Sequence, residues 1–267
     1  VILFTDSGTD SADAVIGAFG LDDSMQQVFG RQVGYRPPKT MNTIVTKLHP
    51  ADPRVIDDFK GRIQSFIVPV AGSSFAAIVP KGDHLSVGIG RVCQGRADLH
   101  KALHYAMERL GICLDDAAVY GHPLPCYQTP RWPWGRGAQE ALSTRRCVLV
   151  GDAAGLLDPL IGEGIRYAII SARLAAEAIA ADDLAGYEVA IWREIGHSLA
   201  TAGMVANTYY RIPRLSYQIG LRNPATVRHV LDILTEKANY EAVGRRLFGA
   251  AVGWLLFGNR PGDEARI

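Results

Sequence analysis

The sequence predicts a mixed α/β fold that combines a strand–turn–helix unit, an antiparallel sheet and a helical C-terminal region. Residues 147–150 are an apolar run, followed by a turn of small residues and then by an amphipathic helix from Ile165 onward. Between residues 64 and 92, apolar residues alternate with others as they do in antiparallel strands. Residues 186–267 have the apolar spacing of helices.

The composition is that of a globular protein and argues against a nucleic-acid binder. The chain has 267 residues, 48% of them hydrophobic, which allows one large domain or two small ones. Its 28 Lys and Arg residues nearly balance its 27 Asp and Glu residues, which gives a net charge of +1. Because affinity for a phosphate backbone depends on clustered positive charge, no nucleic-acid partner is expected.

The cysteines indicate a reducing compartment. None belongs to a Cys-x-x-Cys pair, so reduced and mostly buried thiols are expected, without a metal site or a disulfide framework, at Cys93, Cys113, Cys126 and Cys147. The opening VILFTDSGTD is a brief apolar run followed by acids, which is not a signal peptide. A cytoplasmic location is therefore expected.

The N-terminal part is expected to contain short elements. Residues 1–4, VILF, have the character of the end of a buried strand, residues 5–13 of a turn, and residues 14–21 of one or two helical turns. A strand is expected around residues 43–45 and a short helix at residues 53–59.

The region from residue 64 to residue 92 is predicted to be an antiparallel sheet. After a turn at residues 80–83, apolar residues alternate with small ones: Leu85, Val87 and Ile89 with Ser86, Gly88 and Gly90. The face that carries the glycines leaves space either for a neighbouring backbone or for a ligand.

A helix and an irregular segment are expected next. Residues 97–110 have apolar residues at helical spacing, and Gly111 follows at a C-cap position. Residues 121–136 hold four prolines together with Trp132 and Trp134, so they are expected to form an extended loop or edge segment. The aromatic side chains of that segment would line a cavity or cover the core.

The strand–turn–helix unit at residues 146–180 carries the chemistry. Its turn holds the carboxylate of Asp152, and its helix starts after a pair of glycines, Gly162 and Gly164. Free amides and the positive dipole end at a helix start favour anionic or electron-rich groups. An aspartate at the carboxyl end of a strand can accept hydrogen bonds from sugar hydroxyls. The unit is therefore expected to bind a polyol phosphate, the alternative being a tight connection whose glycines serve only the turn.

The string GDAAGLLDPLIGEGI at residues 151–165 resembles the second flavin-binding motif of the superfamily that contains geranylgeranyl reductases and para-hydroxybenzoate hydroxylase-type monooxygenases. That motif reads approximately GDAAxxxxPxxGxGxxxA, and it is matched by Gly151, Asp152, Ala153, Ala154, Pro159, Gly162, Gly164 and Ala168. The resemblance implies that the chain contains the C-terminal part of a Rossmann-like FAD-binding domain.

The resemblance also implies how FAD is bound. Asp152 would bind the ribityl hydroxyls, and Pro159 would lie close to the isoalloxazine. The pyrimidine end of the ring and the phosphates would face the backbone of Gly162, Glu163, Gly164 and Ile165, while Gly151 belongs to the same motif. No catalytic residue is assigned, and the candidate proton donors near the predicted cavity are Tyr120, His122 and Tyr127.

Two further stretches support the geranylgeranyl reductase branch. Residues 79–90, VPKGDHLSVGIG, are similar to a segment of those reductases that ends in VGxG. Residues 8–15, GTDSADAV, resemble the GADGxxSxV motif that precedes the sheet domain, which implies a cofactor-binding role for Asp10.

The chain also departs from the family pattern. The first motif, a GxGxxG that binds the ADP half of FAD, is absent, so an N-terminally truncated chain is expected that by itself binds FAD weakly or not at all and has exposed strand edges. Ser11 and Ala14 replace the glycine and serine of the third motif. Reductases commonly carry a YxWxFP pattern whose matching positions here are Phe75, Ala77, Val79 and Pro80. Loss of the tryptophan reshapes that wall of the substrate site.

The predicted domains follow from the resemblance. Residues 1–21 and 143–185 would form the remnant of the FAD-binding domain. Residues 22–142 would form an antiparallel-sheet substrate domain, and residues 186–267 a helical C-terminal region.

Helices are expected in that last region at residues 187–204, 226–237 and 240–257. The apolar stretch within residues 245–257 is too short to span a bilayer. It would be either a buried terminal helix or an interfacial helix in peripheral contact with a membrane.

The expected function is FAD-dependent reduction of carbon–carbon double bonds in a prenyl, or geranylgeranyl, chain. The flavin would be reduced by NAD(P)H or another external donor, and the substrate would be an apolar small molecule or lipid. Two alternatives stay open. One is an FAD-dependent aromatic monooxygenase, which shares the Asp152 motif, and the other is a non-catalytic fragment or remnant.

Overall fold

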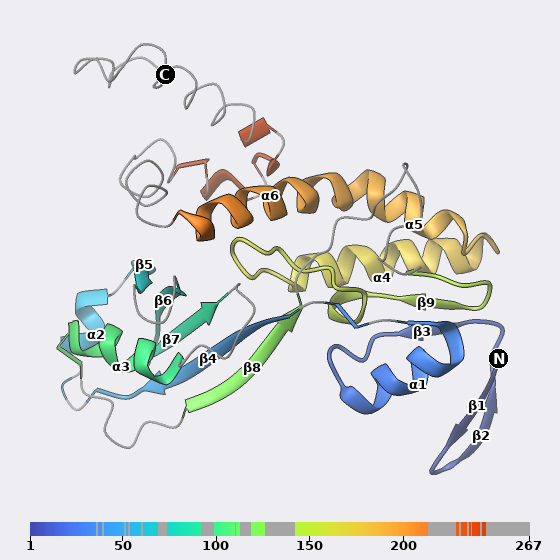
Figure 1. The fold of residues 1–267 in the computed structure, drawn as a ribbon, viewed down its shortest axis with the longest axis horizontal. Coiled ribbons are helices and arrows are strands. Elements are labelled where there is room, and N and C mark those ends of the chain that lie inside the picture. The colour runs from blue at the N-terminus through green and yellow to red at the C-terminus, as the bar shows by residue number, and fades with distance from the viewer. Residues whose placement is uncertain are drawn as a thin grey trace.

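Figure 1 shows the fold of the chain as a computed structural model. The structure describes residues 1–35, 37–38, 40–50, 52, 54–59, 61–68, 74–91, 99–109, 111–112, 119–125, 142–212, 228–229, 231–233, 235, 237–240 and 242–243.

The strands are β1 (Ile2–Thr5), β2 (Gly8–Ser11), β3 (Val15–Gly17), β4 (Thr40–Leu48), β5 (Gln64–Val68), β6 (Ser74–Lys81), β7 (His84–Arg91), β8 (Val119–Pro125) and β9 (Cys147–Leu149). The α-helices are α1 (Asp23–Val33), α2 (Arg54–Phe59), α3 (Leu99–Arg109), α4 (Ile165–Ala180), α5 (Gly186–Ile191) and α6 (His197–Arg211). A 3-10 turn, η1 (Gly151–Ala154), precedes α4, and a π-helical turn, η2 (Trp192–Gly196), joins α5 to α6.

One antiparallel sheet contains five strands in the order β5-β6-β7-β4-β8. Gly82 and Asp83 make the turn between β6 and β7, and Gly82 takes a left-handed φ of +59° that glycine adopts without strain. The antiparallel sheet predicted between residues 64 and 92 is therefore confirmed. So is the strand predicted around residues 43–45, which lies within β4.

Helix α3 covers one face of this sheet. Its Leu103 and Ala106 side chains are buried in one cluster with Leu85, Val87 and Ile89 of β7. The helices predicted at residues 97–110 and 53–59 are confirmed as α3 and α2. The prediction of an edge segment is confirmed as far as β8, which lies beside β4 at the sheet margin.

A separate two-stranded sheet pairs β3 with β9 in parallel, with Ile16 opposite Val148. The prediction of helical turns at residues 14–21 is therefore wrong. Val15 and Ile16 are β-branched and favour a strand once a partner strand is available. The buried strand predicted at residues 147–150 is confirmed, since Val148 is fully buried in β9.

Strands β1 and β2 form a hairpin that projects from the rest of the described chain (Figure 1). A strand at residues 1–4 is confirmed, but the prediction that it is buried is wrong, because Phe4 is 83% exposed. Part of the turn predicted at residues 5–13 is strand β2. A two-stranded hairpin without a second layer packed on it leaves its apolar side chains uncovered, which explains their exposure.

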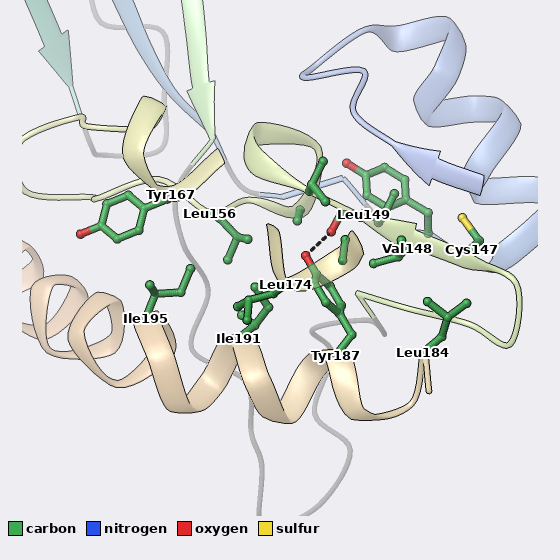
Figure 2. Packing of buried hydrophobic residues seen from close by; sticks show 14 of the residues in the cluster. Cys147, Val148, Leu149, Leu156, Tyr167, Leu174, Leu184, Tyr187, Ile191 and Ile195 are labelled. Atoms are coloured by element: carbon green, nitrogen blue, oxygen red, sulfur yellow. Dashed lines mark hydrogen bonds between the residues drawn. The ribbon is translucent and has the colours of Figure 1, made fainter. Parts of the chain in front are cut away.

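One apolar core surrounds β9 and joins it to α4 and α5 (Figure 2). The fully buried Tyr187 of α5 donates a hydrogen bond from its hydroxyl to the Leu149 carbonyl oxygen over 2.7 Å. Phe29 of α1 and Tyr35 belong to the same cluster, although both lie within the predicted segment 22–142. The domain boundaries stay predictions.

A long helical segment runs from Gly186 to Arg211 as α5, η2 and α6, which confirms the helix predicted at residues 187–204. Near its end, the Tyr210 hydroxyl donates a hydrogen bond to the Leu160 carbonyl oxygen over 3.0 Å. The segment therefore contacts β9 through Tyr187 and the turn before α4 through Tyr210.

Several predicted features lie outside the described residues: Cys93, Cys113, Cys126, Tyr127, Trp132, Trp134 and residues 245–257. Cys147 is a buried free thiol, and burial raises its pKa to about 11. Across the part of the chain that is described, no helix has the length and apolar character needed to cross a membrane.

Replacing Tyr187 by Phe is expected to lower the free energy of unfolding by about 1–2 kcal/mol, because the buried Leu149 carbonyl loses its side-chain donor. Chemical denaturation followed by circular dichroism measures the loss. Tyr120→Phe is the matched control: Tyr120 is 63% exposed on β8 and should change stability by less than about 0.5 kcal/mol. Equal losses in the two variants would contradict a specific role for the Tyr187 hydroxyl.

Candidate functional site

The chain leaves β9 through a tight turn that contains the predicted flavin motif. Gly151 and Gly155 take left-handed φ values of +56° and +66°, which suit glycine. The Gly151 N–H donates to the Ser171 hydroxyl over 3.0 Å, and a Cβ added at Gly151 would lie only 3.0 Å from the Cβ of Ala168. Both contacts are with α4, so they fix the turn against that helix.

Asp152 lies half-buried in this turn and reaches the start of α4. A Cβ added at Gly164 would be 3.1 Å from its Oδ1 atom. Among the described residues, nothing donates a hydrogen bond to its carboxylate. Burial raises the pKa of Asp152, and the nearby His122 of β8 opposes that rise. The turn thus holds a partly desolvated carboxylate that has no hydrogen-bond donor in the described part of the chain.

The start of α4 carries no side-chain cap. Gly164 occupies the N-cap position and has no side chain to accept from the first N–H groups of the helix. The first turn of α4 itself holds no acidic residue, and the nearest carboxylate from the preceding turn is that of Asp152. Ile165, the first residue of α4, is 80% exposed. The helix start is therefore open to an acceptor group of a ligand.

The remaining motif residues face different neighbours. Gly162 has a left-handed φ of +74°, and a Cβ there would lie 3.8 Å from Leu124 of β8. Glu163 pairs with Arg166, with 3.2 Å between Oε1 and Nε. Pro159 is buried, and its ring lies 3.9 Å from where a Cβ on Gly203 of α6 would be.

A second carboxylate, Asp158, is fully buried beside the turn and was not singled out from the sequence. Its Oδ1 accepts hydrogen bonds from the N–H groups of Leu160 and Ile161 over 2.8 and 3.1 Å. Its Oδ2 lies near the buried hydroxyl of Tyr240, and neither atom completes a hydrogen bond among the described residues. Burial raises the pKa of Asp158, whereas the Tyr240 hydroxyl and the two N–H groups lower it. The available signal was a lone acid within the apolar string LLDPLI.

The structure does not bring all predicted residues to this turn. Asp10 lies opposite Leu3 on the exposed β1–β2 hairpin, which projects away from β9 and α4 (Figure 1). Among the candidate proton donors, His122 lies near Asp152, and Tyr120 is exposed two residues away on β8.

The turn meets the five-stranded sheet at one end. Met41 of β4, Leu124 of β8 and Leu157 pack together there. On the sheet face away from α3, a Cβ added at Gly88 would meet, among described residues, only the Val45 side chain at 4.0 Å. The prediction that the glycines leave space is therefore confirmed at Gly88. Gly88 lies on the sheet face that carries Met41, which contacts Leu157 after the Asp152 turn.

Comparison with known proteins finds relatives that are named as geranylgeranyl diphosphate reductases. No model of a known protein family matches the chain. It is 26% identical over 209 residues to the geranylgeranyl diphosphate reductase of Synechocystis sp., a match that covers 71% of this chain and 49% of the relative. It is 32% identical over 201 residues to the chloroplastic geranylgeranyl diphosphate reductase of Oryza sativa, covering 74% of this chain and 40% of the relative. The chain thus spans less than half the length of these two relatives.

Solved structures share the fold. A geranylgeranyl bacteriochlorophyll reductase-like protein from Thermoplasma acidophilum superposes with a TM-score of 0.57 at 21% identity, covering 74% of this chain and 51% of that one. A tryptophan 6-halogenase from Streptomyces toxytricini gives a TM-score of 0.51 at 15% identity, covering 82% of this chain and 41% of that one. Both confirm the predicted mixed α/β class.

The structure of residues 151–165 and the sequence matches agree with the resemblance to geranylgeranyl reductases. The motif that predicted the family folds as a strand, a glycine-flanked carboxylate turn and an uncapped helix. The curated relatives whose names state a function are reductases of geranylgeranyl compounds. The chain is similar to geranylgeranyl diphosphate reductases over 71% and 74% of its own length.

Proposed function

We propose that residues 151–165 bind the ribityl chain and isoalloxazine ring of FAD, and that the protein reduces carbon–carbon double bonds of a prenyl chain. The observation that carries this proposal is the Asp152 carboxylate, half-buried and without a hydrogen-bond donor among the described residues. A desolvated carboxylate is unfavourable unless something donates to it. Ribityl hydroxyls are donors of the required kind.

The residues around Asp152 fit a flavin. Because Gly164 has no Cβ, the Asp152 carboxylate can lie across the start of α4; a side chain there would press on Asp152 and on Leu157, at 3.1 and 3.3 Å. The first amides of α4 can donate to a carbonyl or phosphate oxygen. A bound, reduced flavin would supply the hydride. The contribution of this chain is to bind and orient the ring.

The open face of the sheet fits an apolar substrate. Val45 of β4 lies opposite Gly88 of β7, which in turn lies opposite Ala77 of β6. These small or apolar residues share one face, and the contact between Met41 and Leu157 brings that face to the flavin turn. A prenyl chain lying along this face would bring one of its double bonds at a time to the turn. The names of the reductase relatives support the same substrate class.

The proton donor and the electron donor belong to the proposal. His122 is the better placed of the predicted proton donors, since it lies near Asp152. We assign the reduction of the flavin to NAD(P)H or another external donor. Peripheral contact with a membrane through residues 245–257 stays a prediction.

The activity is tested under anaerobic conditions with FAD, dithionite or NADPH, and geranylgeranyl diphosphate. Mass spectrometry should show products heavier by two hydrogens for each double bond reduced, and only when FAD is added. Asp152→Ala should form at least about tenfold less product. Flavin binding without any product would contradict the prenyl reductase, whereas absence of binding of riboflavin and FMN as well as FAD would contradict the flavin site itself.

The alternatives give other results in the same preparation. An aromatic monooxygenase should couple NADPH oxidation to oxygen uptake when a phenol is added, without prenyl reduction. A non-catalytic fragment should show neither activity.

Asp152→Ala is expected to weaken flavin binding by roughly one to two orders of magnitude, since a charge-assisted hydrogen bond contributes about 1.5–3 kcal/mol. Fluorescence titration with riboflavin, FMN and FAD measures it. All three ligands carry the ribityl chain, so all three should lose affinity by a similar factor. Loss confined to FAD would place Asp152 at the nucleotide end and contradict its assignment.

Asp152→Asn is expected to leave the ligand-free protein as stable as the wild type, or more stable, at pH 7. Burial raises the folded-state pKa of Asp152 above 3.8, so the folded state binds the proton more tightly than the unfolded state. The carboxyl therefore stabilises the fold most below pH 3.8, and this contribution is lost as the pH rises through the folded pKa. Thermal midpoints recorded between about pH 4 and pH 7 should show the variant gaining on the wild type as pH rises. A less stable variant at pH 7 would reveal a protein partner for the carboxylate.

Asp158→Ala is expected to cost about 2–3 kcal/mol of unfolding free energy, because the N–H groups of Leu160 and Ile161 lose their acceptor. Asp158→Asn keeps an acceptor oxygen and should lose less than half as much. Denaturation measures both, and flavin titration should show weaker binding for the alanine variant, since these residues lead into Gly162. Identical behaviour of the two variants would exclude a supporting role for Oδ1.

A further inference from the structure

Two histidines and one aspartate meet at the end of the five-stranded sheet that lies away from the flavin turn. His49 directly follows β4, His84 begins β7, and Asp83 lies in the turn before it. The pairing of β4 with β7 ends with Leu48 opposite Leu85, and His49 and His84 are the residues adjacent to this last pair in the chain. The centroids of the two imidazole rings are 5.2 Å apart.

The carboxylate of Asp83 lies near the Nδ1 atoms of both rings. Asp83 Oδ1 is 2.8 Å from the Nδ1 atom of His84, and Asp83 Oδ2 is 4.0 Å from the Nδ1 atom of His49. One possible ligand atom from each residue lies within 4.8 Å of the other two. The cluster depends on strand register, because His49 is far from Asp83 and His84 in the sequence.

We propose that His49, Asp83 and His84 form a binding site for a divalent transition-metal ion such as Zn²⁺. Two imidazole nitrogens and one carboxylate oxygen are a donor set that suits Zn²⁺ and related ions, whereas Ca²⁺ and Mg²⁺ prefer oxygen ligands alone. Three protein ligands leave at least one position for water or an exogenous ligand.

Small side-chain movements would complete the coordination. Ligands about 2.0–2.1 Å from a tetrahedral Zn²⁺ lie roughly 3.3 Å from one another, so the widest separation has to close by about 1.5 Å. The side chains of His49 and Asp83 are 61% and 82% exposed and can turn without disturbing the core. The His84 side chain is only 19% exposed and serves as the fixed member. The ion would replace the Asp83–His84 contact and tie the end of β4 to the β6–β7 turn.

The site is separate from the proposed flavin site. Met41 near the start of β4 packs against Leu157, and His49 follows the other end of that nine-residue strand. At about 3.3 Å per residue, roughly 26 Å of strand separates the two. Metal binding therefore tests this proposal independently of flavin binding.

Another pair of histidines has to be controlled for. His100 and His104 are exposed on α3 four residues apart, a spacing that lets two imidazoles share an ion. His104→Ala removes one of them without touching the proposed site, so it is the matched control.

The test is isothermal titration of the full chain, free of any affinity tag, with ZnCl₂ in a buffer that does not bind metal. The wild type and His104→Ala should each bind one equivalent at the same affinity. His49→Ala and Asp83→Asn should each bind at least about tenfold more weakly, with metal-free thermal midpoints unchanged because both side chains are exposed. These two variants are preferred to His84→Ala, which removes a largely buried ring.

Three results would overturn the proposal. They are absence of binding to the wild type at roughly 100 μM Zn²⁺, wild-type affinity in His49→Ala or Asp83→Asn, and loss of binding in His104→Ala. Loss of binding in His104→Ala would indicate that the ion binds to the histidines of α3 instead.

Discussion

The parallel pairing of β3 with β9 is the constraint on which the proposed site depends. It holds Val148 and Leu149 in the core, with Tyr187 bonded to the Leu149 carbonyl from the helical side (Figure 2). A strand fixed in this way delivers the chain to Gly151 at a defined position and direction. The turn that follows is bonded to α4 through Ser171, so the strand, the turn and the helix hold one geometry together. A ligand site formed by a turn gains its accuracy from such rigid neighbours.

Two carboxylates, the fully buried Asp158 beside this turn and the half-buried Asp152 in it, serve the turn in opposite ways. The Oδ1 atom of Asp158 accepts hydrogen bonds from two backbone N–H groups of its own loop. Burial raises the pKa of Asp158, and those hydrogen bonds partly offset the rise. Asp152 has no such donors among the described residues, and its pKa is also raised by burial. The first carboxylate therefore supports the backbone, and the second remains available to a ligand. The distinction in role rests on hydrogen-bond partners, since both residues are aspartates.

Regular elements were predictable because their apolar period reports burial directly, as in α3 and in the segment from Gly186 to Arg211. Short elements were not. Strand β3 holds too few residues to show a period, and its partner β9 is more than a hundred residues away, so local propensity could not identify it. Helix α1 was missed although its ends carry local signals, an Asp22 side chain that accepts from the Met25 N–H and a left-handed Gly34. The motif identified Asp152 by its spacing, whereas Asp158 required knowledge of what packs around it.

The π-helical turn Trp192–Gly196 sets the phase between the two halves of the long C-terminal helix. A π turn holds one residue more than an α-helical turn, and each residue corresponds to about 100° of rotation about the axis. Before this turn the helix presents Tyr187 to β9, and after it the helix presents Gly203 to Pro159 and Tyr210 to Leu160. Deleting a single residue here would restore regular α-helix and rotate α6 by about 100° relative to α5. The extra residue in the π turn therefore lets one continuous helical segment contact both strand β9, through Tyr187, and the turn before α4, through Gly203 and Tyr210.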